Sequence, residues 1–243
     1  MKGVILAGGL GTRLGPLTKI TNKHLLPVYD RPMIFYPIQT LINIGVQDIL
    51  LVTGGHRAGD FLRLLGNGRA FGLKHIHYTY QENEGGIAEA LSLAEDFAGG
   101  EKICVILGDN LIEKNVRRPA DAFREQKSGA RIILKETTEA RRFGVAEIRD
   151  GRVVGIEEKP QRPKSQYAVT GIYFYDGTVF DVVRTLKPSA RNELEITDVN
   201  NAYIARGEMT YDLLDGWWSD AGTIESIYRA ATLVLETGAN RLE

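Results

Sequence analysis

The sequence of 243 residues is poor in several features that would identify a protein's location or chemistry. It has a single cysteine, so no disulfide can form within one chain, and we expect a cytoplasmic protein. It has no excess of either charge, with 30 basic and 31 acidic residues, which argues against a nucleic-acid partner. It has no apolar run close to the ~18 residues of a membrane span and no signal-peptide pattern at its start, so we expect no membrane partner.

The few cysteine and histidine side chains form no catalytic or metal-binding pattern. Cys104 lies in the apolar run 103–107 and is expected to be a small buried hydrophobic residue. His75 and His77 share one face of an expected strand, but no cysteine or acidic neighbour gives them the spacing of a zinc site. We therefore assign both histidines a structural role.

Short apolar runs alternate with helical patterns in the first half of the chain. The expected strands there cover residues 3–7, 48–53, 75–80 and 103–107, and the expected helices cover 33–44, 57–65 and 87–97. The second half has expected strands at 130–135, 144–149, 153–158 and 168–175, and expected helices at 178–185, 196–206 and 223–235. Asp150-Gly151 is expected to form the hairpin turn between two of these strands.

This alternation predicts the α/β class and a single domain over residues 1–243. Strands that alternate with helices form βαβ units and a mostly parallel sheet. We expect a Rossmann-like, three-layer α/β/α architecture around a mixed, mostly parallel central sheet. Residues 1–115 should form the nucleotide-binding half, and residues 116–243 should complete the sheet and line the pocket.

A glycine-rich loop, Gly8 to Leu14, follows the first expected strand. Glycine permits sharp turns and exposes backbone N–H groups, so the loop suits a polyphosphate, with Arg13 and Lys23 as counter-charges. The loop fits a dinucleotide motif only in part, because Leu14 stands at the third glycine position, and the chain contains no P-loop. The alternative is a solvent-exposed turn with incidental charges.

Two aspartates follow apolar segments far apart in the chain. Asp109 comes after a fully apolar expected strand, and Asp220 comes before an expected helix. Carboxylates together with phosphate oxygens are ligands that Mg²⁺ prefers, so the pair could hold one ion across a triphosphate. The alternative for each is a turn or N-cap aspartate, more so for Asp220. Spacing does not decide whether the two converge.

A cluster of opposite charges, Glu157-Glu158-Lys159-Pro160, ends another expected strand. Its carboxylate could accept sugar hydroxyls and its ammonium could meet a phosphate, although a solvated surface pair is the alternative. The pairs Arg117-Arg118 and Arg141-Arg142 are expected on solvated faces.

Together these motifs resemble the sugar-1-phosphate nucleotidyltransferase family, and most specifically its thymidylyl-transferring branch. The matching segments occur in family order and span nearly the whole chain: residues 6–14 (LAGGLGTRL), 23–30 (KHLLPVYD), 107–110 (LGDN), 157–160 (EEKP), 169–175 (VTGIYFY) and 193–200 (ELEITDVN). The resemblance implies that dTTP and glucose 1-phosphate react to give dTDP-glucose and pyrophosphate. The sugar phosphate would attack the α-phosphorus in line, assisted by Mg²⁺, without a covalent enzyme intermediate.

The resemblance also assigns roles to individual positions. The catalytic residues would be Arg13, Lys23, Asp109, Lys159 and Asp220, of which Asp109 and Asp220 would hold Mg²⁺. Nucleotide binding would involve, besides Arg13, Lys23 and Asp109, the residues Leu6, Gly8, Gly9, Gly11, Thr12, Gln81, Gly86 and Ile87. The sugar phosphate would be bound by Asn110, Gly144, Glu158, Lys159, Val169, Tyr173, Arg191 and Trp218. The amide of Gln81 fits the donor and acceptor edge of thymine or uracil.

The chain departs from the family pattern in places, and rival functions stay open. His24 stands where many members have glutamine, and Phe143 stands where tyrosine is common. Longer members have additional C-terminal helices that help to form a regulatory site, and we do not expect these helices here. We expect the protein to form a homodimer or a homotetramer. The main rival activity uses UTP, because uracil presents the same edge as thymine. A nucleotide-sugar sensor without turnover and a nicotinamide dehydrogenase also compete with this assignment.

Overall fold

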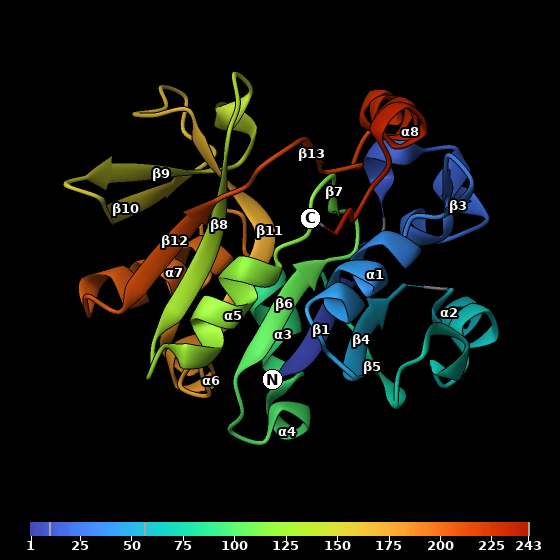
Figure 1. Ribbon diagram of the computed structural model, residues 1–243, viewed down its shortest axis with the longest axis horizontal. Coiled ribbons are helices and arrows are strands. Elements are labelled where there is room, and N and C mark those ends of the chain that lie inside the picture. The colour runs from blue at the N-terminus through green and yellow to red at the C-terminus, as the bar shows by residue number, and fades with distance from the viewer. Residues whose placement is uncertain (10, 56, 243) are drawn as a thin grey trace.

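The computed structural model describes residues 1–9, 11–55 and 57–242, and it confirms the α/β class (Figure 1). Among these residues, nine strands form one mixed sheet in the order β10-β9-β11-β6-β1-β4-β5, with β8 paired to β11 and β12 paired to β8. Its strands are β1 (Lys2–Ala7), β4 (Asp48–Gly54), β5 (His75–Gln81), β6 (Ile103–Leu107), β8 (Ala130–Glu136), β9 (Gly144–Arg149), β10 (Arg152–Glu158), β11 (Tyr167–Tyr175) and β12 (Met209–Leu213).

Two small ribbons and a set of helices complete the described structure. The ribbons pair β2 (Pro27–Val28) with β3 (Arg31–Pro32) and β7 (Leu111–Ile112) with β13 (Trp218–Ser219). The helices are α1 (Phe35–Asn43), α2 (Ala58–Leu65), α3 (Ile87–Ser92), α4 (Glu95–Ala98), α5 (Arg117–Glu125), α6 (Val179–Thr185), α7 (Ile196–Ala205) and α8 (Ile224–Thr237). None of the helices described is both long enough and apolar enough to cross a membrane.

The centre of the sheet is parallel, which positions the loops that follow its strands. β1 lies between β4 and β6 and is parallel to both, and β5 is parallel to β4. The carboxyl ends of these strands therefore share one edge of the sheet, where open α/β folds bind ligands. β11 is antiparallel to β6, so the start of β11 faces the same edge.

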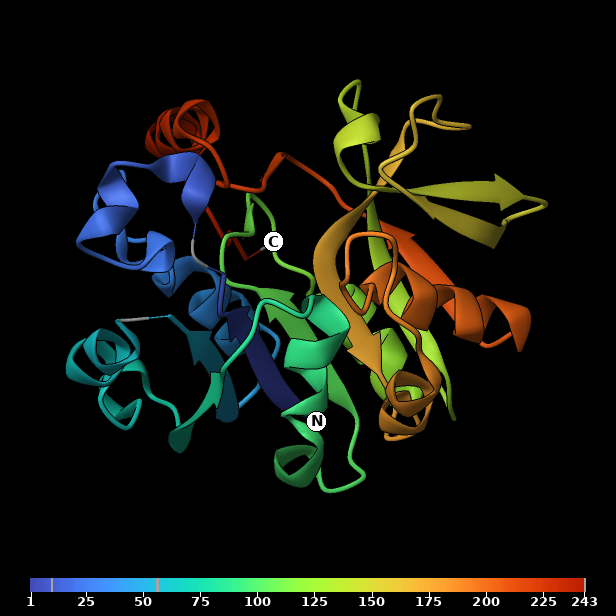
Figure 2. The same cartoon turned by 180° about the vertical axis from the view of Figure 1, so that it is seen from behind.

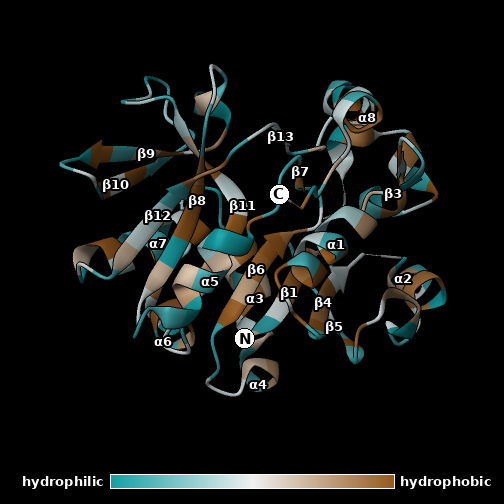
Figure 3. Ribbon diagram, viewed as in Figure 1, coloured by the Kyte–Doolittle hydropathy of each residue, from teal (hydrophilic) through white to brown (hydrophobic). Residues whose placement is uncertain are grey.

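Helices cover both faces of the sheet, as the three-layer prediction requires. One core cluster packs α3, α6 and α7 against the sheet through Leu91, Phe180 and Tyr203 (Figure 2). The opposite cluster includes Ile38 of α1 and Phe123 of α5. Figure 3 shows that the central strands between these layers are predominantly hydrophobic. Cys104 is fully buried in the second cluster, and this confirms its expected structural position.

Most predicted elements are present, and the differences have local causes. The Asp150-Gly151 turn is confirmed, since both residues have positive φ and the flanking strands pair. The helix predicted over 87–97 is instead two short helices, because Ser92 Oγ donates to the Glu89 carbonyl and Ala94 N–H donates only three residues back, to Leu91. Helix α5 (RRPADAFRE) and strand β12 (MTYDL) were not predicted, because each contains few strongly apolar residues.

Candidate active site

A cleft of about 620 Å³ lies at the carboxyl edge of the parallel strands. It is lined by the loops after β1 and β6, by the end of β5 and by parts of β9, β10, β11 and α7. Its lining includes most of the residues predicted from sequence, namely Leu6, Gly8, Gly9, Arg13, Lys23, Gln81, Gly86, Ile87, Asp109, Asn110, Gly144, Glu158, Lys159, Val169, Tyr173, Arg191, Trp218 and Asp220. Gly11 and Thr12 are not part of the lining described, and Leu10 of the predicted loop lies outside the described residues.

The glycine loop packs closely at two positions. A Cβ on Gly8 would lie 2.5 Å from Gln81 Oε1, so a larger residue there would displace the end of the Gln81 side chain. Gly11 has φ +65°, and its Cβ would lie 2.9 Å from the Lys23 side chain. The following 3-10 turn buries Leu14 completely, which anchors the loop beneath Arg13.

Lys23 and Asp109 form an ion pair on the floor of the cleft. Lys23 Nζ lies 2.6 Å from Asp109 Oδ2, and each side chain is only 14% exposed. Burial raises the pKa of Asp109, but the Lys23 ammonium and the hydrogen bonds from Lys23 and Asn110 oppose this effect and hold that pKa below its ordinary value. Asp109 is therefore an ionised carboxylate at neutral pH.

Asp220 is electrostatically coupled to Asp109, which spacing alone could not establish. Burial, and then the charge of Asp109, raise the pKa of Asp220, while Arg142 and Arg13 partly oppose the rise. The N-cap alternative for Asp220 is wrong, because α8 is capped by Thr223, whose Oγ1 accepts from the Ser226 N–H at 3.2 Å. The tertiary structure therefore brings the two carboxylates into one cleft.

The prediction that Arg142 decorates a solvated face is wrong. Arg142 Nη2 donates to Asp220 Oδ2 at 3.3 Å, and its side chain is 29% exposed. The 3-10 turn Ala140–Arg142 ends one residue before β9 and directs this side chain into the cleft, whereas Arg141 remains exposed as expected. A tandem arginine pair gives no sequence signal of which member turns inward.

Asn110 ties three parts of the site together. Its Oδ1 accepts hydrogen bonds from Trp218 Nε1 at 2.6 Å and from the Gly171 N–H at 3.0 Å, and its Nδ2 donates to Asp109 Oδ1 at 3.0 Å. The Gly171 N–H points at Asn110 where the β8–β11 register shifts between Val169 and Tyr173. Since Asn110 is only 2% exposed, this network fixes the positions of the indole and the carboxylate.

A second group of charges occupies the other side of the cleft. Glu158, at the end of β10, accepts a hydrogen bond from Thr197 Oγ1 at 2.6 Å. Lys159 Nζ and Arg191 Nη2 each lie 3.5 Å from Glu158 Oε1. Lys159 has φ +43°, a conformation that is unfavourable for lysine and typical of functional sites. Both cations remain partly exposed, at 50% and 40%, and can meet an anion.

Several residues of this region were not assigned roles from the sequence. Thr197 orients Glu158, and Glu195 Oε2 accepts from Arg191 Nη2 at 2.7 Å. Both residues lie in the matching segment 193–200, so the family motif includes them, but it does not show which side chains they contact. Glu89 was missed for a different reason, because only the fold places it beside Gln81.

The amide of Gln81 has a fixed orientation. Gln81 Nε2 donates to Glu89 Oε2 at 2.6 Å, and the same carboxylate oxygen accepts from the Gly85 N–H at 2.9 Å. Gln81 Oε1 consequently faces the backbone of Gly8. Gln81 Nε2 also donates to the Gly86 carbonyl at 3.4 Å, and the Gln81 side chain forms part of the wall of the cleft.

The arrangement suits a reaction between two phosphate groups. Among the described residues that line the cleft, none is cysteine or serine. Burial, followed by the Lys23 charge, lowers the pKa of His24 to about 3, so this imidazole is neutral and its Nδ1 bonds to Asn22 Oδ1 at 2.8 Å. The cleft therefore offers cations and carboxylates for positioning charge, and no activated nucleophile.

The chain is similar to known proteins over nearly its whole length. The family model described as nucleotidyl transferase matches residues 2–237. A glucose-1-phosphate thymidylyltransferase from Neisseria meningitidis is 45% identical over 96% of this chain and 82% of the relative. A crystal structure from Bacillus anthracis, assigned to the same enzyme, is 50% identical with a TM-score of 0.93, covering 97% of this chain and 96% of that one. A UDP-glucose pyrophosphorylase structure, 23% identical with a TM-score of 0.83 over 97% and 98% of the two chains, shares the fold.

Proposed function

This chain belongs to the nucleotidyl transferase family, in its glucose-1-phosphate thymidylyltransferase branch, and we propose that its cleft transfers a thymidylyl group from dTTP to glucose 1-phosphate. The observation that carries the proposal is that two sets of cations, Arg13 with Lys23 and Lys159 with Arg191, line one cleft together with paired carboxylates. A triphosphate and a sugar phosphate need these two sets of counter-charges in one place.

The reaction follows from this placement of charge. An oxygen of the sugar phosphate attacks the α-phosphorus of dTTP, and the bond from that phosphorus to the bridging oxygen of the β-phosphate breaks. Pyrophosphate leaves with the electron pair of that bond. Arg13 stabilises the departing pyrophosphate, and Lys23 neutralises the α-phosphoryl group as charge develops there. The attacking phosphate is already ionised, so no general base is needed.

The carboxylates of Asp109 and Asp220 form a donor set that fits Mg²⁺. Both offer hard oxygen ligands, and the charge of Asp109 raises the pKa of Asp220, as expected of carboxylates that can share a cation. When bound, Mg²⁺ supplies positive charge to the phosphate oxygens. Turnover should therefore stop when EDTA removes divalent ions and should return when Mg²⁺ is restored.

The sugar phosphate occupies the half of the cleft that contains Glu158. Lys159 and Arg191 bind its phosphate, and Glu158 accepts the glucose hydroxyls in an orientation fixed by Thr197. The remaining wall of the sugar pocket is formed by Asn110, Gly144, Val169, Tyr173 and Trp218. Trp218 packs against Phe143 with ring centroids 4.7 Å apart, so an apolar ring stands beside the sugar.

The nucleoside occupies the other half. Leu6, Gly8, Gly86 and Ile87 line this part, and the Gln81 amide reads the thymine edge. Uracil presents the same edge, and only the 5-methyl group and the 2′-position separate dTTP from UTP. An apolar contact with one methyl group discriminates weakly, so UTP is the competing substrate to test.

A matrix of nucleotides and sugar 1-phosphates tests the proposal directly. Pyrophosphate release would be measured with dTTP or UTP against each sugar phosphate. We expect the highest kcat/KM for dTTP with glucose 1-phosphate. A preference for UTP of about tenfold or more would overturn the thymidylyl assignment. Nucleotide-sugar binding without pyrophosphate release would show that the protein is a sensor.

We also propose that the protein is a homodimer or homotetramer that works in the cytoplasm. Helix α8 presents exposed apolar side chains, Ile224, Tyr228 and Leu235, of which Tyr228 is 76% exposed. Exposed apolar side chains along one helix support an interface with a second copy. Sedimentation velocity would measure the assembly, and a monomer at all concentrations would contradict it.

A further inference from the structure

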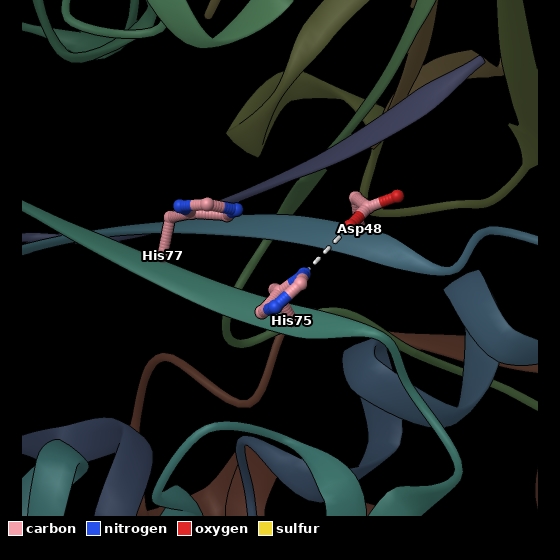
Figure 4. A group of neighbouring side chains, drawn as sticks. All are labelled: Asp48, His75 and His77. Carbon is pink, nitrogen blue, oxygen red and sulfur yellow. Dashed lines mark ion pairs between the residues drawn. The ribbon is translucent and has the colours of Figure 1, made fainter.

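Three potential metal ligands meet at the amino ends of β4 and β5, outside the cleft (Figure 4). Asp48 begins β4 and is paired in register with His75, which begins β5. His77 lies two residues further along β5, so its side chain is on the same face as that of His75. No acidic residue stands at zinc-site spacing from the two histidines in the sequence, but strand pairing brings Asp48 beside His75.

The ligand atoms are close enough to share an ion. His75 Nδ1 lies 3.5 Å from Asp48 Oδ1, and the two imidazole rings have centroids 5.7 Å apart. One ligand atom from each residue lies within 4.8 Å of the other two. Metal bonds of about 2.0–2.2 Å in a tetrahedral site separate ligand atoms by roughly 3.3–3.6 Å. The ligand atoms can reach these shorter separations by side-chain rotation, since the His75 side chain is 62% exposed.

We propose that Asp48, His75 and His77 bind a divalent transition-metal ion of the zinc type. Two imidazoles and one carboxylate suit Zn²⁺ and related ions, whereas Mg²⁺ prefers oxygen ligands alone. Three protein ligands leave a position for water or a further donor. The bound ion ties the edge strand β5 to β4. His77 also packs its ring against Phe97 with centroids 5.2 Å apart, which limits the orientations of that ligand.

The proposed site is separate from the cleft. His75 begins β5 and Gln81 ends it, and at about 3.3 Å per residue these positions are roughly 20 Å apart. Among the described residues, the remaining histidine and cysteine, His24 and Cys104, offer no competing site because they are buried. His56 lies outside the described residues. The carboxylates of the cleft are the alternative binding place, and excess Mg²⁺ would occupy them.

Calorimetric titration with Zn²⁺ in the presence of excess Mg²⁺ tests the site. We expect about one equivalent to bind to the wild-type chain and no binding to the double variant His75→Ala/His77→Ala. Asp48→Asn should weaken Zn²⁺ binding at least about tenfold. Removal of a residue that only supports a metal ligand already lowers metal affinity by about this factor, and removal of a ligand itself should lower it at least as much. Lys74→Ala removes an exposed side chain next to His75 that supplies no ligand, and it should bind Zn²⁺ like the wild type.

Co²⁺ provides a spectroscopic check, because its visible absorption bands are intense in a tetrahedral site and weak for the hydrated ion. These bands should appear with the wild type and with Lys74→Ala, and they should be absent from the double variant. Thermal unfolding without metal verifies that each variant folds. If the double variant does not fold, His75→Asn and His77→Asn tested singly should each weaken Zn²⁺ binding. Wild-type affinity in the histidine variants, or no binding to the wild type, would overturn the proposal.

Discussion

Arg142 Nη2 lies 3.3 Å from Asp220 Oδ2, across 78 residues of sequence, and so places a cation on one of the two carboxylates in the cleft. The same guanidinium is held from its other side, because Nη1 donates to Glu139 Oε2 at 3.1 Å. Arg229 donates to that oxygen at 3.2 Å. Arg142 is therefore a positioned counter-charge whose contribution to the site is measurable.

Arg142→Ala should move the acid limb of the pH–rate profile to higher pH. Burial and Asp109 raise the pKa of Asp220, and Arg142 lowers it, so removal of the guanidinium raises that pKa further. Because the proposed metal site needs Asp220 ionised, activity should then be lost at a higher pH as the solution is acidified. The measurement is kcat/KM as a function of pH. Arg141→Ala is the matched control, and an unshifted limb in Arg142→Ala would contradict this role.

Asp109→Asn should lower Mg²⁺-dependent turnover by at least about a hundredfold, because it removes a charge placed at the reacting phosphates. The substitution keeps the shape of the side chain, and Asn110 can still contact it, so the protein should remain folded. Pyrophosphate release and thermal unfolding would be measured on the same samples. Asp150→Asn, in the exposed hairpin turn, should retain full activity. Undiminished turnover in Asp109→Asn would refute the metal role.

Thr197→Val should lower kcat/KM for glucose 1-phosphate by about 10- to 100-fold, the effect of losing one hydrogen bond to a charged group. Thr197 Oγ1 donates to Glu158 Oε2 at 2.6 Å, and valine has the same shape without the donor. The KM for dTTP should change little, since Glu158 contacts the sugar side. Thr197→Ser restores the hydroxyl and should restore most of the activity. A change confined to the KM for dTTP would show that the role of Thr197 lies elsewhere.

His24→Gln should make the protein less sensitive to acid. Burial lowers the pKa of folded His24 to about 3, whereas an unfolded histidine has a pKa near 6.5. Between these values the unfolded state binds a proton that the folded state does not, so stability is fully present above about pH 6.5 and is lost as the pH falls. Because of His24, the free energy of unfolding should fall by about 2 kcal/mol as the pH is lowered from roughly 7 to 5.

Urea unfolding of the wild type and of His24→Gln, near pH 7 and near pH 5, measures this loss of stability. Near neutral pH the stabilities should depend only on packing and on the bond to Asn22, which a glutamine amide can also make. Toward acid the wild type should lose more stability than His24→Gln. Equal losses would show that the imidazole is protonated in the folded protein.

Local patterns predicted the individual elements and many of the residues at the ends of strands. The run ending at Leu107 is apolar because β6 is buried on both faces, and Asp109 follows it because the chain then leaves the core. The Asp150-Gly151 turn was predictable because its two positive φ values depend on those residues alone. The helix over 87–97 was not predicted correctly, because hydrogen bonds at single residues divide it.

The sequence by itself therefore determined the α/β class, the glycine loop and the motifs that identify the family, since each depends on neighbouring residues. Only the tertiary structure decided which distant side chains meet: Arg142 with Asp220, Thr197 with Glu158, and Asp48 with His75. Such pairs depend on strand register and on the direction in which turns point. The free energy that selects these geometries comes from burial over the whole core, and no short segment records it.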